Sequence, residues 1–176
     1  MDARFHAFGI AVRYPDGRKD FRTDISVLIQ ELQQAYGQEL ERATVVMQNS
    51  PFDYTILFRK YGLRIRNFID TLWLFYSVHG RREETGAESG AGLEDMAKFF
   101  GLAVRKNKAD IDAMNGVRNP TVQQMIDLGA YAKNDVEITH QVAMLLLPDV
   151  PRPEIELPLM QHTTRLYVER NGMWVM

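Results

Sequence analysis

The first 47 residues change their hydrophobic period twice, and this order of elements restricts the chain to few folds. Residues Phe5–Arg13 alternate loosely, which predicts a strand. The turn residues Pro15-Asp16-Gly17 and the segment Arg18–Arg22 predict its hairpin partner. A helical period follows over Ile25–Tyr36, and the short apolar run Thr44–Met47 is typical of a buried strand. A hairpin, a helix and a buried strand in this order indicate an α/β fold.

The rest of the chain is mainly helical in pattern. We expect a helix over Phe52–Tyr61, a strand over Leu63–Ile69, a mobile loop over residues 80–92, and helices that begin at Asp70 or Thr71, at Leu93 and at Pro120. Few strands are visible for a sheet that so many helices must flank. The sequence therefore predicts a mixed sheet flanked by helices, with an antiparallel hairpin and one strand missing.

Composition excludes several classes of protein. The absence of cysteine excludes disulfide scaffolds, thiolate zinc sites and cysteine nucleophiles. Lys and Arg number 21 against 23 Asp and Glu, so the chain lacks the basic excess of a general nucleic-acid coat. Without a signal pattern at its start or an apolar run of membrane length, we expect a cytoplasmic protein. Four of its seven prolines lie from Pro148 onward, which predicts a domain over residues 1–147 and a connector over 148–176.

Two short patterns carry candidate chemistry. Asp53 follows a strand and a turn and opens a helix, so its carboxylate lies where open α/β sheets place their ligands. A helix cap is the alternative interpretation of Asp53. Tyr131 and Asp135 are four positions apart on a long helix and share a face, where they could orient water and hold a metal. The alternative is a core aromatic beside an exposed charge.

Other motifs are absent. The chain has no P-loop, dinucleotide-binding or serine-hydrolase signature, and its four histidines lack metal-ligand spacing. Basic clusters occur at Arg59–Arg66, at Arg81-Arg82 and at Arg105–Lys108. They are typical of solvated faces, with a groove that follows phosphates as the alternative.

Taken in order, several motifs resemble the DEDD superfamily of 3′–5′ exonucleases. They are N-x-x-F-D at Asn49–Asp53, I-D-T-L at Ile69–Leu72, a helix that begins after Gly92 and ends at Phe99-Phe100-Gly101-Leu102, and Y-x-x-x-D-V at Tyr131–Val136. More narrowly, the set is similar to the proofreading domain, tyrosine subtype, of bacteriophage family A DNA polymerases. Residues Asp2–Gly9 resemble the start of the second strand in those enzymes. The segment Glu156–Thr163 resembles the connector into the polymerase domain.

This resemblance implies a ribonuclease H-like fold and assigns roles by motif. Asp53 and Asp135 match metal-binding acids, and Tyr131 matches the tyrosine that positions the attacking water. Asn49 and Phe52 match positions beside the 3′-terminal nucleotide. Asp70 matches a position that we interpret as structural, a helix cap below the site.

The chain departs from the family at the first motif. In phage relatives a D-x-E on the first strand supplies two of the four metal carboxylates, about twenty residues before the segment that matches Asp2–Phe8. Since this chain begins at Met1, we expect that strand and both acids to be missing. Asp53 and Asp135 would then compensate a two-ion Mg²⁺ or Mn²⁺ site poorly. The alternating segment Leu166–Val168, in cis or in a homodimer, could fill the vacant strand position.

The resemblance implies a proofreading exonuclease that acts on single-stranded DNA 3′ ends, weak or incomplete as the chain stands. A separate polymerase or an upstream fragment would supply D-x-E, and a phage-encoded protein would act in the host cytoplasm. Two alternatives stay open. One is a catalytically inactive relative that serves as a nucleic-acid or protein interaction module. The other is an RNA-trimming exonuclease like ribonuclease D, which the connector resemblance disfavours.

Overall fold

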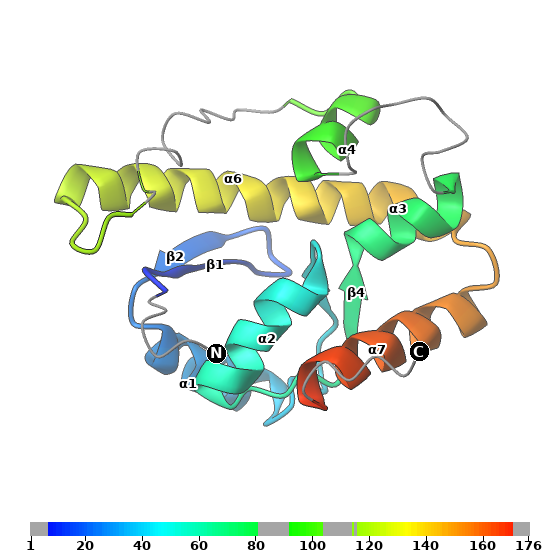
Figure 1. Cartoon of the computed structure of the whole chain (residues 1–176), viewed down its shortest axis with the longest axis horizontal. Coiled ribbons are helices and arrows are strands. Elements are labelled where there is room, and N and C mark those ends of the chain that lie inside the picture. Colours follow the sequence, from blue (N-terminus) through cyan, green and yellow to red (C-terminus); the bar gives the residue numbers. More distant parts are fainter. Residues whose placement is uncertain (1–6, 81–91, 104–113, 115, 171–176) are drawn as a thin grey trace.

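The computed structural model describes residues 7–80, 92–103, 114 and 116–170 (Figure 1). Its elements are β1 (Ile10–Arg13), β2 (Lys19–Arg22), α1 (Ile25–Tyr36), β3 (Val45–Met47), α2 (Ser50–Tyr61), β4 (Phe68–Asp70), α3 (Thr71–His79), α4 (Leu93–Phe99), α6 (Val122–Leu146), η2 (Leu147–Asp149) and α7 (Pro153–Glu169). The chain is thus mixed α/β, with short strands and many helices. Among the described residues, no helix is both long and apolar enough to cross a membrane.

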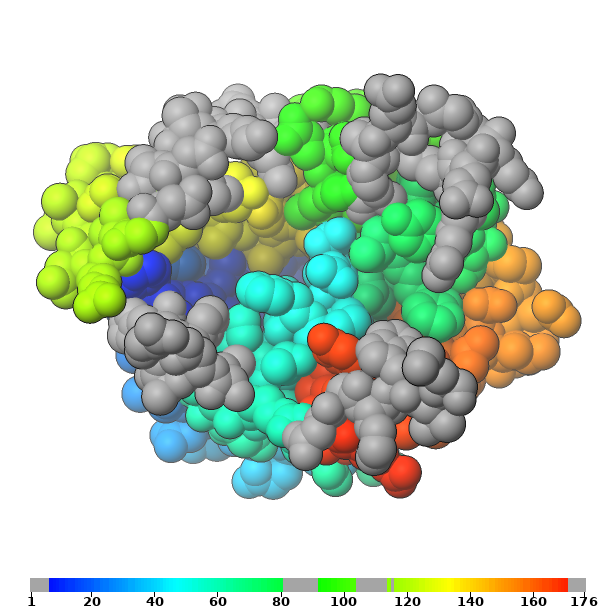
Figure 2. All heavy atoms as spheres, viewed as in Figure 1, coloured from blue at the N-terminus to red at the C-terminus, as the bar shows by residue number. Residues whose placement is uncertain are grey.

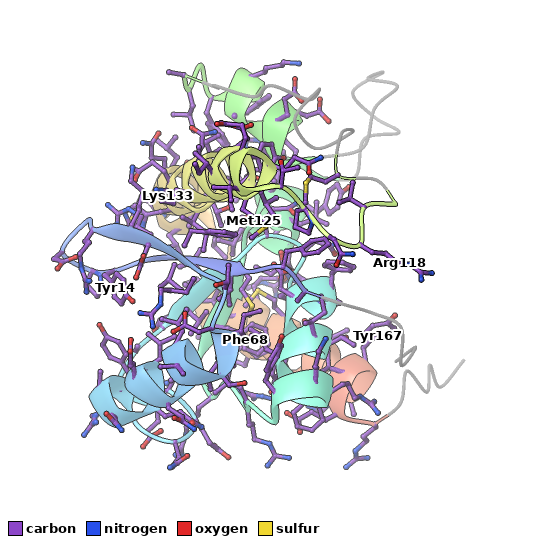
Figure 3. The ribbon with its side chains drawn as sticks, turned by 90° about the vertical axis from the view of Figure 1, so that its left-hand side faces the viewer. Tyr14, Phe68, Arg118, Met125, Lys133 and Tyr167 are labelled. Atoms are coloured by element: carbon purple, nitrogen blue, oxygen red, sulfur yellow. The ribbon has the colours of Figure 1, made fainter. Side chains whose placement is uncertain are left out.

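The strands lie between two groups of helices. Figures 1 and 3 show α4 and α6 above the strands, and α1, α2 and α7 below them. In Figure 3, Tyr14 marks the tip of the hairpin and Lys133 lies on α6 above it. The long helix α6 contacts β1, β2 and β3, so one helix covers strands from both ends of the layer.

Among the described residues, the strands form two separate pairs. Strands β1 and β2 are antiparallel, with Ile10 opposite Arg22 and Arg13 opposite Lys19. Strands β3 and β4 are parallel, with Val45 opposite Phe68. No ladder joins the two pairs within the described ranges, so β1 and β3 each pair on one edge only.

Each group of helices encloses its own apolar core. The upper core consists of buried residues from α3, α4, α6 and the segment after η2: Leu74, Phe75, Leu93, Met96, Ala97, Ile138, Val142, Leu146 and Val150. The lower core joins α1, α2, α7, β3 and β4 through Ile25, Ile29, Leu40, Met47, Tyr54, Leu63, Ile65, Phe68, Met160 and Val168. In Figure 3, Phe68 lies near the centre of the molecule.

The sequence predicted most of these elements. The helix over Ile25–Tyr36 is confirmed with its bounds, because its apolar positions follow the helical period and Gly37, at a φ of 96°, ends it. The predicted strand Phe5–Arg13 is shorter, since β1 begins at Ile10, and Phe5 and His6 lie outside the described residues. The predicted strand Leu63–Ile69 contracts to Phe68–Asp70. Most of the loop expected at 80–92 and the start of the match at Asp2 also lie outside the described residues.

The segment after Pro148 differs from its prediction as a strand or plain connector. Leu166–Val168 is part of helix α7, so the expectation that it fills the vacant strand position is wrong. The helix packs on α2 and β4 and buries Met160 and Val168 in the lower core. Tertiary packing therefore outweighs the cost of Pro158 inside the helix. The domain boundary at 147 stays a prediction.

Candidate active site

Asp70 joins the two turns that begin α2 and α3. Its carboxylate Oδ1 accepts hydrogen bonds from the backbone N–H of Leu72, at 2.9 Å, and of Asn49, at 3.0 Å. Its Oδ2 accepts from the N–H and from the hydroxyl of Ser50, both at 2.8 Å. Asp70 is buried, and these four donors satisfy its charge. The interpretation of Asp70 as a structural helix cap is thereby confirmed, and the aspartate also anchors the turn after β3.

This anchored turn presents three candidate residues to solvent. Asn49 adopts a left-handed backbone conformation, at φ 55° and ψ 55°, and helix α2 begins at the next residue. Asn49 and Asp53 are exposed, and Phe52 is exposed over 62% of its surface. In Figure 2 the start of α2, in cyan, lies at the middle of the visible face between α6 and α3. The predicted group of Asn49, Phe52 and Asp53 is therefore one exposed cluster at the carboxyl end of β3.

The environment of Asp53 disfavours its negative charge. The surrounding protein desolvates the carboxylate, and the negative charge of Asp70 repels it, which together raise the pKa of Asp53 to about 6. The position of Asp53 in the first turn of α2 favours the charge through the helix dipole, but that effect is the smaller one. A raised carboxyl pKa in an exposed cluster is typical of a functional site rather than of a simple cap.

Tyr131 and Asp135 lie on α6, on the stripe that enters the upper core. The spacing of three and four residues places Asp135 in line with Ile138, Thr139 and Val142, all of which are buried. The Oδ1 atom of Asp135 is itself buried. This excludes the alternative that Asp135 is a fully exposed helix charge. A separation of at most about 8 Å between the carboxylates of Asp53 and Asp135, which a shared two-ion site requires, stays a prediction.

Within the described part of the chain, no three His, Cys, Asp or Glu side chains are grouped closely enough to hold a metal ion. Asp53 and Asp135 supply two carboxylates, whereas two divalent ions about 4 Å apart need several. The described donor set therefore does not fit a two-ion centre.

Sequence reasoning missed the contacts that hold this site from below. Ser50 is buried, and its hydroxyl lies 3.3 Å from that of Thr164 on α7. Neither residue belongs to a recognisable motif, and their separation in the sequence left no local signal. In the basic cluster at Arg59–Arg66, Arg59 donates to the carbonyl oxygen of Val168, and Arg64 pairs with Glu169. These two arginines hold α7, so this cluster has a structural use.

The chain was compared with known families, proteins and structures. The family model for the 3′-5′ exonuclease domain of family A DNA polymerases matches residues 20–151, which is most of the chain. The matched region begins in the hairpin and ends after α6, so it contains Asp53, Tyr131 and Asp135. Neither the curated proteins nor the solved structures gave a significant match.

Proposed function

Because the chain belongs to the family of 3′-5′ exonuclease domains of family A DNA polymerases, we propose that it serves in proofreading and releases nucleoside monophosphates from single-stranded DNA 3′ ends. Members of this DEDD family are hydrolases that generally use divalent metal ions. The observation that carries the proposal is the exposed carboxylate of Asp53, with its pKa raised to about 6, on a turn fixed by four hydrogen bonds to Asp70.

Five residues have roles in this proposal. Asp53 and Asp135 are the family's metal-binding acids, and Tyr131 orients the attacking water. Phe52 offers a large exposed apolar surface on which a terminal base can stack, and Asn49 lies beside it. The matched family favours DNA over RNA as the substrate.

The proposal includes a ribonuclease H-like sheet with a vacant central position. Strands β1 and β3 each have one edge without a strand partner among the described residues, while α6 contacts both strands. A further extended segment could satisfy the backbone groups of both edges. If that segment carried D-x-E, it would add two carboxylates beneath α6. We propose that an upstream segment or a separate polymerase chain, in a phage replication system in the host cytoplasm, supplies this strand.

The direct test is digestion of a 3′-labelled single-stranded oligonucleotide with Mn²⁺. The chain alone should digest it slowly or not at all, and a version extended upstream with a D-x-E strand should digest it faster by several orders of magnitude. Loss of a single stabilising group in an active site commonly costs about 10²–10³ in rate. In the extended enzyme, Asp135→Ala should abolish digestion and Tyr131→Phe should slow it more mildly. Rapid Mn²⁺-dependent digestion by the unextended chain, lost in Asp53→Ala, would contradict the missing-strand proposal.

The incomplete donor set also favours a second candidate, a binding module without catalysis. Fluorescence anisotropy with a labelled oligonucleotide separates the two functions. A binding module would retain a 3′-ended strand uncut, and Phe52→Ala would weaken that binding, in both the unextended and the extended chain. Cleavage by the extended chain would exclude this candidate.

A further inference from the structure

A chain of buried polar groups connects α7 to the turn that bears Asp53. Thr164 of α7, Ser50 of α2 and Asp70 of β4 are all buried, with exposed fractions of 3%, 0% and 4%. The hydroxyl oxygens of Thr164 and Ser50 are 3.3 Å apart, and the Ser50 hydroxyl lies 2.8 Å from Asp70 Oδ2. Three elements that are distant in the sequence thus meet through side-chain hydrogen bonds.

The direction of these hydrogen bonds follows from the number of protons. The Ser50 hydroxyl has one proton, which it donates to the carboxylate of Asp70. Its oxygen can therefore only accept from Thr164, so the Thr164 hydroxyl is the donor. The relay runs from Thr164 through Ser50 to Asp70, which also receives the backbone N–H groups of Asn49 and Ser50.

Apolar packing alone does not require this relay. Helix α7 already buries Met160 and Val168, and the Met160 sulfur accepts the backbone N–H of Asp70 at 3.2 Å. A valine at position 164 would fill nearly the same volume as threonine, but it would leave the buried Ser50 oxygen without its donor. The hydroxyl of Thr164 therefore serves orientation in addition to packing.

We propose that Thr164 is a positioning residue for Asp53, which acts by fixing Ser50 and Asp70 and thereby the turn Asn49–Asp53. This inference rests on the proposed role of Asp53 in the exonuclease site. It assigns to α7 a part in the site, although the helix lies beyond the residues that the family model matches.

The test compares Thr164→Val with Thr164→Ser and with Gln161→Ala in the full chain. Gln161 of α7 donates to the carbonyl oxygen of Phe68 at 2.9 Å, so its loss weakens the same helix–strand contact outside the relay. Hydrogen exchange is measured for the amides of Asn49 and Ser50, with Val46 of β3 as the internal reference. In Thr164→Val we expect exchange at Asn49 and Ser50 to accelerate about tenfold relative to Val46. Thr164→Ser should restore the wild-type ratio, and Gln161→Ala should leave it unchanged.

A second measurement records the carboxyl-carbon NMR signal of Asp53 at pH 8. The signal should shift or broaden in Thr164→Val and should match the wild type in the other two variants. If Thr164→Val does not fold, Ser50→Ala, which keeps the Ser50 N–H bond to Asp70, should show the same local effects. A purely structural Thr164 would lower the melting temperature while the exchange ratio and the Asp53 signal stay unchanged, and this result would overturn the inference. Neither readout needs substrate, so an inactive protein would fail the activity test without affecting this one.

Discussion

Asp53 and Asp70 are both aspartates at the start of a helix, but their surroundings give them opposite roles. Asp70 is enclosed by four donors and holds two turns together. Asp53 is exposed, and no described donor compensates the desolvation and repulsion that raise its pKa. The sequence could predict the cap at Asp70, because its partner Leu72 is two residues away. It could not predict the bonds to Asn49 and Ser50, whose partners come from another element.

Asp53→Asn should stabilise the protein at neutral pH. The folded protein holds a proton on Asp53 up to a pKa of about 6, whereas the ordinary value is 3.8. Stability due to this group is therefore lost as pH rises from about 4 to about 6. We expect the variant to have a higher melting temperature than wild type at pH 7.5 and an equal one near pH 4. Asp149→Asn, at an exposed aspartate of η2, is the control, and an equal gain for Asp53→Asn at both pH values would contradict the explanation.

At the scale of elements, Phe21 of β2 fixes the distance between the hairpin and α6. A Cβ atom built at Gly129 of α6 would lie 2.8 Å from the Phe21 ring, and one built at Gly9 would lie 2.4 Å from it. The ring is therefore enclosed by two glycines, one from the chain before β1 and one from α6. This contact explains why a glycine can stand inside a long helix.

Gly129→Ala should destabilise the protein even though alanine favours a helix by about 1 kcal/mol. Because Gly9 blocks the Phe21 ring on its other side, the ring cannot move away, and overpacking of this kind costs about 1–3 kcal/mol. We expect a net loss of about 1 kcal/mol in urea unfolding. Phe21→Leu in the same chain should restore part of the loss. A more stable single variant would show that the hairpin moves freely against α6.

Glu137 provides a second, charged contact between α6 and the hairpin. Its carboxylate accepts a hydrogen bond from Gln141 and pairs with Lys19 and Arg13 at 3.1 and 3.2 Å. Mainly the Gln141 hydrogen bond, and then the Lys19 and Arg13 contacts, lower the pKa of Glu137 to about 2, against the burial that opposes this change. The contact therefore stabilises the protein above about pH 4.5 and is lost as pH falls toward 2.

Glu137→Gln should lower the free energy of unfolding at pH 7 by about 1 kcal/mol, since partial exposure screens the ion pairs. The difference from wild type should shrink between pH 4.5 and pH 2, measured by urea unfolding at several pH values. Glu31→Gln, which breaks an exposed pair with Arg22, is the control and should change stability by less than about 0.5 kcal/mol. A deficit that persists at pH 2 would assign the effect to packing.

The predictability of the elements follows the strength of their local patterns. Helix α1 could be predicted with its bounds because its apolar stripe and terminal glycine agree. Helix α7 could not, because Pro151, Pro153 and Pro158 indicate a linker, and only packing against α2 and β4 makes the segment helical. Strand β4 is shorter than predicted, since Leu63 and Ile65 are buried in the lower core without joining the ladder.

At the scale of the whole molecule, the candidate site combines parts that no local pattern connects. Motif order in the sequence indicated the family, and the family match confirmed that assignment. The support of the site by α7 lies outside the matched residues and depends on contacts between distant segments, such as Ser50 with Thr164. Periodicity describes single elements, so it could not indicate this contact.

Removal of residues 148–176 should therefore destabilise the entire lower half of the molecule. The truncated chain would lose Met160 and Val168 from the core, and full burial of such side chains contributes about 1.5–3 kcal/mol each. It would also lose the partner of the Tyr54 hydroxyl, which donates to Glu169 at 2.8 Å. Since domains of this size have total stabilities of about 5–15 kcal/mol, we expect a chain of residues 1–147 to be partly unfolded at 25 °C. Circular dichroism and urea unfolding would measure this, with a chain of residues 1–170 as the control. A shortened chain that unfolds at the same urea concentration as the full one would establish residue 147 as a domain boundary and reduce α7 to a connector.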